Sequence, residues 1–282
     1  MNALYDIAAP AKLNLFLHVI GRRPDGYHLL QSVFVLIDWC DTLHVERRPD
    51  GRLLRHDLSA ALPEDDLCLR AARLLQAESG CRLGADISID KQVPWGAGLG
   101  GGSSDAASTL LALNRLWGLH WPRARLLELG LRIGADVPFF LGGRNAWVEG
   151  IGERLAPLEL PPTWYAVIKP PVAIATRDIF TSSLLVRDSE PAILAGFLAD
   201  TNFGRNDLQR AAEAASSEVA AACRLLEDRF DNSRMTGSGS AVFARAGTGS
   251  QPMATMPAMP AEWVGRMCCS LQVHPLVGWS ED

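Results

Sequence analysis

Five glycines fall within seven positions in the segment Pro94-Trp95-Gly96-Ala97-Gly98-Leu99-Gly100-Gly101-Gly102-Ser103-Ser104-Asp105. Apolar and polar residues alternate over 84–91, immediately before this segment, and that period predicts a strand. A helix is expected directly after it, capped by Ser103 and Ser104 and running to about Trp117. A strand, a glycine-rich loop and a helix therefore follow one another without a break.

A loop of this kind is suited to bind a polyphosphate. Glycine lacks the Cβ that would keep a backbone from wrapping around a phosphate, and the start of a helix offers unpaired N–H donors and a partial positive charge. The hydroxyls of Ser103 and Ser104 add contacts to phosphate or to phosphate-bound Mg²⁺. A plain flexible turn is the alternative, which the flanking strand and helix disfavour. The predicted nucleotide-binding residues are Pro94, Gly96, Gly98, Leu99, Gly100, Gly101, Gly102, Ser103 and Ser104.

Three known phosphate loops compare poorly with this segment. A Walker A loop ends in G-K-[ST], and no lysine follows these glycines. Gly96, Gly98 and Gly101 satisfy G-x-G-x-x-G, but a dinucleotide site needs a second strand with an acidic end about 20 residues later, where this chain predicts another helix. A protein kinase would need H-R-D and D-F-G, which are absent from the sequence, although 166–169 faintly resembles its lysine strand.

The remaining pattern predicts a mixed α+β fold. Strands are expected over 13–20, 29–37, 42–48, 145–149, 164–169 and 264–273, and helices over 66–79, 122–133, 177–184 and 209–230. Prolines near 157–162 favour a division into domains 1–156 and 157–282, with the final strand free to return to the first domain. The segment 247–260, rich in Gly, Ser, Pro and Met, is expected to be a loose connection.

Composition narrows the class of protein. The 282 residues are 48% hydrophobic and carry a net charge of −5, which disfavours broad electrostatic binding of nucleic acid or of a membrane surface. The first residues do not resemble a secretory signal, and no apolar run is long enough to span a bilayer, so we expect a cytoplasmic protein. Six cysteines without paired spacing are expected to be buried thiols, and no metal site is predicted.

Several separated motifs together resemble the GHMP kinases. The glycine-rich segment resembles the second motif of that family, Pro10-Ala11-Lys12-Leu13-Asn14-Leu15 the first, and Met235-Thr236-Gly237-Ser238-Gly239-Ser240-Ala241-Val242-Phe243 the third. Arg23-Pro24-Asp25-Gly26-Tyr27-His28 and Gly134-Ala135-Asp136-Val137-Pro138-Phe139-Phe140 match one subgroup. The resemblance spans almost the whole chain. Ser238 replaces the threonine of some relatives but keeps the hydroxyl.

The resemblance implies a two-domain fold with the active site in the cleft between the domains. It implies ATP with Mg²⁺ as phosphoryl donor. The acceptor implied is a small molecule, a cytidine-diphosphate-linked methylerythritol, phosphorylated on its 2-hydroxyl in the non-mevalonate route to isoprenoid precursors. We expect a monomer or a weak homodimer.

Two charged residues are the catalytic candidates. Asp136 lies between small residues and an apolar run, where partial burial would raise its basicity, so we predict it as the base; a turn aspartate is the alternative. Lys12 lies in an apolar strand and would pair with Asp136 and polarise the hydroxyl; a solvated lysine is the alternative.

The predicted acceptor-binding residues lie in three segments. Tyr27 and His28 follow a turn and would meet a nucleobase by stacking and hydrogen bonds, or they are a packed hairpin pair. By resemblance Phe180 would cover the other face of the base and Thr176 would lie near the diphosphate or the sugar alcohol. Close approach at Gly237 would let Ser238 hold phosphate. Asn14 is a weaker candidate.

Three other functions stay open at this point. Another small-molecule kinase of the same family would keep the motifs and change the acceptor. A dinucleotide-dependent oxidoreductase would use the glycines differently. A non-catalytic nucleotide-binding protein would bind ATP without transferring phosphate.

Overall fold

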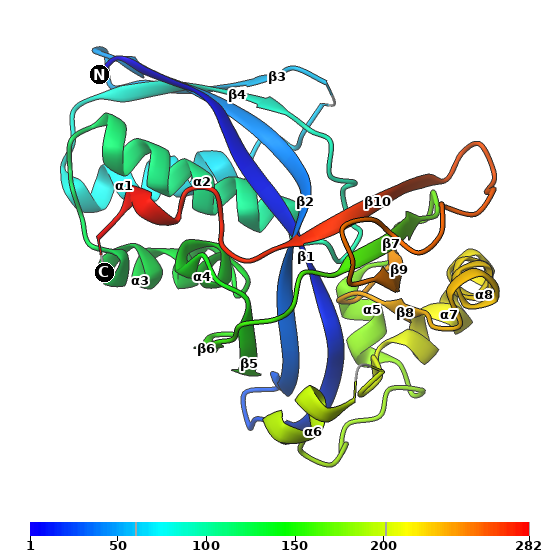
Figure 1. Cartoon of the computed structure of the whole chain (residues 1–282). Helices are drawn as coiled ribbons and strands as arrows, with labels where there is room; N and C mark the ends of the chain where they lie inside the picture. Colours follow the sequence, from blue (N-terminus) through cyan, green and yellow to red (C-terminus); the bar gives the residue numbers. More distant parts are fainter. Residues whose placement is uncertain (60, 201, 282) are drawn as a thin grey trace.

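A long antiparallel hairpin runs through the whole molecule (Figure 1). The computed structural model describes residues 1–59, 61–200 and 202–281. The hairpin consists of β1 (Ala3–Arg22) and β2 (His28–Arg48), joined by the predicted turn at 24–26, which is confirmed. Within the described part of the chain, no helix has the length and apolar character needed to cross a membrane.

β2 organises the sheet because it has different partners along its length. One edge pairs with β1, and the other pairs in turn with β5 (Ala146–Gly150), β10 (Val264–Leu271) and β4 (Gly84–Asp90). β10 then pairs with β7, so the sheet continues from the first half of the chain into the second. The remaining strands are β3 (Leu53–Asp57), β6 (Arg154–Pro157), β7 (Trp164–Lys169), β8 (Arg234–Met235) and β9 (Val242–Gly247).

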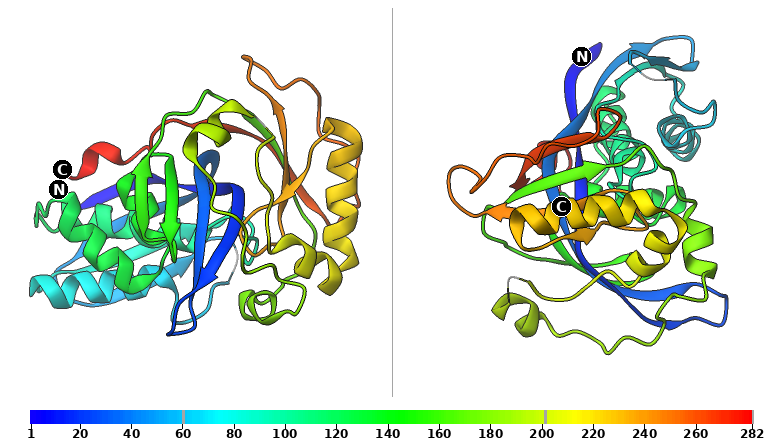
Figure 2. Two further views of the ribbon diagram at one scale, coloured as in Figure 1. Left: turned by 90° about the horizontal axis from the view of Figure 1, so that it is seen from below. Right: turned by 90° about the vertical axis from the view of Figure 1, so that its right-hand side faces the viewer.

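Two groups of helices cover the sheet at opposite ends. The first group contacts β1 and β2 and comprises α1 (Leu67–Ser79), α2 (Gly101–Leu116), α3 (Arg123–Ile133) and α4 (Val137–Gly142). The second comprises α7 (Gln209–Ala215) and α8 (Ser217–Phe230), with α8 packed on β7 and β9. The left view of Figure 2 shows α8 at the far end of the molecule from α1 and α3.

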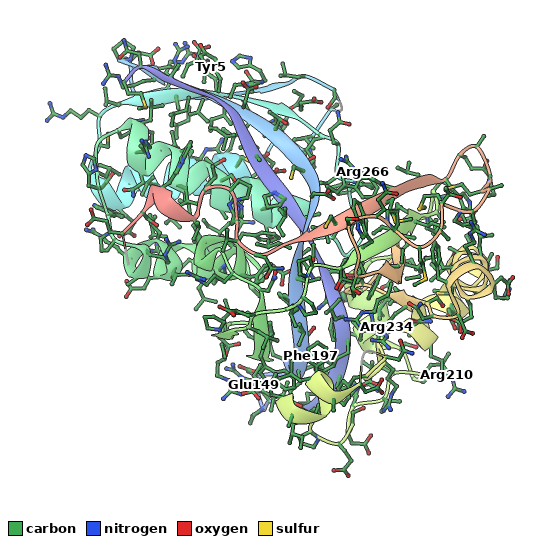
Figure 3. The ribbon with its side chains drawn as sticks, in the orientation of Figure 1. Tyr5, Glu149, Phe197, Arg210, Arg234 and Arg266 are labelled. Carbon is green, nitrogen blue, oxygen red and sulfur yellow. The ribbon has the colours of Figure 1, made fainter. Side chains whose placement is uncertain are left out.

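Alternate residues of β2 enter different cores. Phe34 and Leu36 pack with the first group of helices, while Val35 and Ile37 face a central cluster. A strand sends successive side chains to opposite faces, so an apolar run in β2 joins two cores. Phe197, from α6 (Leu194–Ala199), points toward the lower part of the hairpin and closes the central cluster there (Figure 3).

Some predicted elements end elsewhere in the structure. The predicted helix over 209–230 is wrong as one element, because Ser216 is extended (φ −150°, ψ 118°) and separates α7 from α8. The helix over 177–184 is shorter than predicted: α5 (Thr176–Thr181) ends where Ser182 turns extended. Three cysteines are buried and three, Cys40, Cys81 and Cys269, are half-buried, so the expectation of six buried thiols is only partly right.

The predicted domain boundary, between residues 156 and 157, falls within β6. After it, the C-terminal segment of the chain returns to the first half of the molecule. β10 pairs with both β2 and β7, and the C-terminal 3₁₀ helix η1 (Val277–Trp279) contacts α2. Asn145 holds this return in place: its buried amide accepts the N–H of Leu36 and donates to the carbonyl of Leu271, at 2.8 and 2.9 Å.

Replacing Asn145 by alanine should lower the free energy of unfolding by about 2–4 kcal/mol, because a buried N–H and a carbonyl lose their partner at once. Urea unfolding measures this change. The exposed Asn2→Ala is the control and should stay within about 0.5 kcal/mol of wild type. Equal stability of the two variants would show that Asn145 does not secure the junction of β2 and β10.

Candidate active site

One cavity of about 280 Å³ brings together five segments that lie far apart in the sequence. Its wall takes one residue from β1, three glycines from the glycine loop, one residue from the start of α4, and short pieces of two later loops. The lining residues are Lys12, Gly96, Gly98, Gly100, Asp136, Ile174, Thr176, Gly237, Ser238 and Gly239. The two predicted catalytic residues therefore share a cavity with the predicted phosphate loop.

The glycine loop and the segment 236–239 touch through their backbones. A Cβ on Gly98 would lie 2.2 Å from the carbonyl oxygen of Thr236, and a Cβ on Gly237 would lie 3.0 Å from the Cα of Gly98. Both glycines have positive φ, 75° and 56°. Only glycine adopts that backbone easily and leaves room for the neighbouring chain. The spacing of glycines in the two motifs thus allows two loops to meet at the cavity.

Thr236 ties these two loops to β1. Its hydroxyl oxygen accepts the backbone N–H of Asn14 at 2.9 Å, and its proton can be donated to Asn14 Oδ1 or to the carbonyl of Gly98, each at 3.3 Å. Asn206 steadies the same segment by donating to the carbonyls of Met235 and Gly237. Thr236 is fully buried, so it supports the cavity without lining it.

Lys12 is a buried cation at the floor of the cavity. Its Nζ lies 3.5 Å from Asp136 Oδ2, 2.5 Å from Asn14 Oδ1 and 4.4 Å from the centre of the Phe34 ring. Burial lowers the pKa of Lys12, and the attraction of Asp136 opposes that effect. Its backbone N–H also donates to the carbonyl of Leu99 at 2.9 Å, which fixes the strand to the glycine loop.

Asp136 precedes α4 and keeps its carboxylate available. The side chain makes no capping hydrogen bond with the helix that follows, and about a third of it, 32%, is exposed. Its only ion pair among the described residues is the one with Lys12. A carboxylate that faces open space beside a buried ammonium can take a proton from a hydroxyl held there.

Asn14 was predicted to contact substrate, and the structure places it behind Lys12. Its side chain is buried, bonds Lys12 Nζ and donates to Ser32 Oγ at 3.0 Å. It is not among the residues that line the cavity. Asn14 therefore acts on the cavity through the residues that it bonds, Lys12 and Thr236.

The start of α2 forms the floor of a second cavity of about 350 Å³, which the glycine loop also lines. The helix begins after Gly100, whose φ is 72°, so the prediction that Ser103 and Ser104 cap the helix is wrong. The loop turns into the helix through a left-handed residue, which glycine adopts, and both serines lie inside the helix. Ser103 lines this cavity, whereas the Ser104 hydroxyl is buried.

An apolar recess of about 550 Å³ adjoins the glycine loop. Leu62, Pro63, Val93, Pro94 and Trp95 line both this recess and the cavity above the loop, so the two are continuous. Trp95 is 71% exposed, which is unusual for a side chain of its size. A flat apolar group could lie against the tryptophan while a charged extension reaches the helix start.

Three ionisable side chains are packed beneath the same loop. Lys91 Nζ forms ion pairs with Asp41 and, at 2.6 Å, with Asp105 Oδ2. All three side chains are buried. Sequence reasoning missed these residues because they come from β2, from the end of β4 and from α2, and no local pattern links them.

Thr176 and Ser238 close the opposite wall of the first cavity. Their hydroxyl oxygens lie 2.8 Å apart, so the two side chains hydrogen-bond across the cleft between α5 and the third motif. The loop leading into α5 is held by Lys169, whose Nζ donates to the carbonyls of Pro170 and Val172. The structure therefore brings both predicted residues to the cavity wall.

The predicted aromatic residues lie outside the wall of this cavity, although Phe180 shares α5 with the lining residue Thr176. His28 and Phe180 stack on each other with ring centres 5.0 Å apart, and Tyr27 is 61% exposed. Arg187 lies beside the stack, donating from Nε to His28 Nε2 at 3.3 Å. Burial and the nearby Arg187 and Arg22 lower the pKa of His28. None of the three aromatic residues is among those that line the cavity with Lys12.

No group of three or more His, Cys, Asp or Glu side chains able to hold a metal ion occurs within 1–59, 61–200 and 202–281. The glycine loop has the chemistry to hold a phosphate: Gly96, Gly98 and Gly100 line the cavity without side chains, and all three have positive φ. A divalent cation would reach this site together with a polyphosphate.

Known proteins are similar to this chain over nearly its full length. Residues 66–144 match the family model described as the GHMP kinases N terminal domain. The chain is 70% identical to a 4-diphosphocytidyl-2-C-methyl-D-erythritol kinase of Methylibium petroleiphilum, over 99% of each chain, and 56% identical to one of Paracidovorax citrulli, over 100% of this chain and 99% of that one.

Solved structures show the same relationship. The crystal structure of a 4-(cytidine 5'-diphospho)-2C-methyl-D-erythritol kinase superposes with a TM-score of 0.74 at 37% identity, covering 85% of this chain and 89% of that one. The mevalonate kinase of Methanococcus jannaschii superposes with a TM-score of 0.61 at 13% identity, covering 86% and 90%. The second likeness shows the fold alone.

Gly98→Ala should lower the free energy of unfolding by about 2–4 kcal/mol, because the new methyl combines a strained positive φ with a clash against Thr236. Thermal and urea unfolding measure the loss. Gly102→Ala is the control: Gly102 is the second residue of α2, its φ is not positive, and its Cβ would meet only Leu67 Cδ1 at 3.7 Å. A stable Gly98→Ala would mean that the two loops do not depend on their close contact.

Proposed function

Because the chain belongs to the 4-diphosphocytidyl-2-C-methyl-D-erythritol kinases of the GHMP kinase family, we propose that it transfers the γ-phosphoryl group of ATP to the 2-hydroxyl of that cytidine-diphosphate-linked alcohol. The observation that carries the residue assignment is the shared cavity of Lys12, Asp136 and the glycine loop. Family membership also removes the dinucleotide-dependent oxidoreductase as an alternative.

Asp136 and Lys12 supply the proton chemistry in this proposal. Asp136 takes the proton of the acceptor hydroxyl while the oxygen of that hydroxyl forms a bond to the γ-phosphorus. The bond from that phosphorus to the bridging oxygen breaks, and ADP leaves with the electron pair. Lys12 Nζ, 3.5 Å from Asp136 Oδ2, orients the carboxylate and stabilises the negative charge that develops on the acceptor oxygen.

The glycine loop and the start of α2 hold the phosphates of ATP. Backbone N–H groups at the helix start point at the loop and carry partial positive charge, which stabilises an anion without many basic side chains. The Ser103 hydroxyl faces the same cavity. Mg²⁺, when bound to the phosphates, neutralises part of the charge that develops during transfer.

The apolar recess beside the loop is the proposed place of the adenine ring. Leu62, Pro63 and Val93 offer an apolar wall, and the indole of Trp95 offers a flat face. A base stacked on an aromatic side chain gains about 1–3 kcal/mol. The recess joins the cavity above the loop, so one molecule can occupy both.

The acceptor lies on the other side of the transferred phosphoryl group. Thr176, Gly237 and Ser238 are placed to hold its diphosphate or its sugar alcohol, since all three line the cavity. Tyr27, His28 and Phe180 are the proposed contacts of the cytosine. His28 and Phe180 would have to separate from 5.0 Å to roughly 7 Å, twice a carbon contact distance, to admit a base between them.

The residues proposed for the site all come from one chain, and we propose that one copy suffices for catalysis. We place the reaction in the cytoplasm, with the protein as a monomer or weak homodimer. The cleft is internal to the chain, which is why association would leave the chemistry unchanged.

The purified protein with ATP, Mg²⁺ and 4-diphosphocytidyl-2-C-methyl-D-erythritol should release ADP and phosphorylated acceptor. A coupled assay measures the ADP, and phosphorus NMR identifies the phosphorylated product.

Asp136→Asn should lower kcat by roughly 10³-fold, the typical contribution of a positioned base, while keeping the dissociation constant for ATP. The exposed Asp228→Asn on α8 is the matched control and should keep full activity.

Three results would each contradict part of this assignment. Turnover of mevalonate or homoserine in place of the cytidine compound would move the chain elsewhere in the family. Full activity of Asp136→Asn would remove Asp136 as the base. Binding of ATP without turnover of any acceptor would instead support a non-catalytic nucleotide-binding protein.

Trp95→Ala should raise the KM for ATP roughly tenfold with little change in kcat, because the adenine loses its stacking surface while the phosphate contacts remain. Trp95→Phe should restore most of the affinity, since it keeps a flat face. Steady-state kinetics with ATP as the varied substrate measure both. An unchanged KM in Trp95→Ala would place the adenine elsewhere.

A further inference from the structure

Two carboxylates share one ammonium beneath the glycine loop. Asp41 comes from β2, Lys91 directly follows β4, and Asp105 lies in α2. Their side chains are 0%, 7% and 3% exposed, so water screens the charges poorly. Lys91 Nζ pairs with Asp41 Oδ2 and with Asp105 Oδ2, the latter at 2.6 Å. The reaction described above uses none of the three.

The network is built into both ends of the loop. Asp41 Oδ1 accepts the backbone N–H groups of Gln92 and Val93, at 2.6 and 2.8 Å, where the chain enters the loop. Asp105 lies on the first turns of α2, where the chain leaves it. A Cβ on Gly101 would lie 3.4 Å from both Asp41 Oδ2 and Lys91 Nζ. The three side chains thus lie directly under the first residue of the helix.

The same network borders the cavity proposed for the phosphates. Lys91 and Asp105 both line the cavity of about 350 Å³. With both carboxylates ionised, the three groups carry one net negative charge beside a site that takes a polyanion. With one carboxyl protonated, the net charge is zero. The protonation state of this network therefore changes the electrostatic energy of phosphates bound in the cavity.

Asp105 is the carboxyl group that holds the proton. Its Oδ1 is buried without a hydrogen-bond partner among the described residues, an arrangement that is costly for an ionised carboxylate. Burial raises the pKa of Asp105 to about 8; Lys91 opposes this effect and Asp41 adds to it. Cys68 of α1 also faces Asp105, and burial raises the pKa of that thiol, which stays neutral.

We propose that Asp105 is a positioning residue whose charge state, set through Lys91 and Asp41, determines how tightly the glycine loop binds ATP. This inference rests on the proposed ATP site. Below about pH 8 Asp105 is neutral and the network has no net charge. Above that pH Asp105 ionises, and its negative charge repels the triphosphate. Affinity for ATP is then present at neutral pH and falls as the pH rises.

Calorimetric titration with a non-hydrolysable ATP analogue and Mg²⁺ tests this inference between about pH 7 and about pH 9.5. In the wild type the dissociation constant should rise roughly tenfold across this range. Asp105→Asn keeps the shape and an oxygen for Lys91 but has no charge to gain, so its dissociation constant should stay at the low-pH value of the wild type.

Asp41→Asn removes the charge of this side chain while keeping its hydrogen bonds to the backbone. Its amide oxygen still accepts the N–H groups of Gln92 and Val93, but Lys91 now has Asp105 as its single carboxylate. The pKa of Asp105 should then fall, the pair should stay neutral, and the pH dependence should again disappear. Asp65→Asn is the matched control: Asp65 lines the same cavity but is 69% exposed and outside the network, so this variant should keep the wild-type dependence.

The outcomes are distinguishable. Unchanged pH dependence in Asp105→Asn would overturn the inference and leave the proposed function intact, as would a wild-type affinity that does not vary with pH. A purely structural role would weaken binding in Asp105→Asn equally at every pH, which also overturns it. Failure of the wild type to bind the analogue at any pH would overturn the proposed function itself.

Discussion

The close contact between the backbones of Gly98 and Gly237 is the constraint on which the rest of the site depends. A side chain at either position would push the glycine loop and the third motif apart, because the space between them is already filled by backbone atoms. Thr236, next to that contact, joins both loops to β1. The position of Lys12 in the cavity follows from this junction, since its own N–H bonds the same loop.

Two charge networks border the glycine loop, and they differ in what they face. Lys12 and Asp136 border an open cavity, and the exposed part of the carboxylate is free to react. Lys91, Asp41 and Asp105 are buried under the loop and contact both of its ends. Burial of Lys91, Asp41 and Asp105 leaves their charges weakly screened, so a single proton changes the electric field of that network strongly. One network suits proton transfer, and the other suits control of the phosphate site.

Local sequence patterns predicted the elements that local forces decide. The strand and helix on either side of the glycine loop follow from hydrophobic period, and the turn at 24–26 follows from Pro24, Asp25 and Gly26. The helix start at Gly100 was not predicted from the sequence. Serines usually cap helices, but here the left-handed backbone of Gly100 begins the helix before Ser103 and Ser104. The break at Ser216 was missed for a similar reason: the apolar spacing continues across it while the backbone does not.

The sequence by itself determined the kind of chemistry: glycine motifs for a phosphate, a lysine in an apolar strand, and an aspartate before an apolar run. These features lie in short segments, whose residue types and spacing carry the information. Only the tertiary structure decided which groups meet. Thr236 connects β1 to two loops, and its bond to Asn14 joins residues 222 positions apart. Lys91 likewise joins Asp41 and Asp105, which come from different elements. Such contacts depend on the packing of the whole sheet, which no local period records.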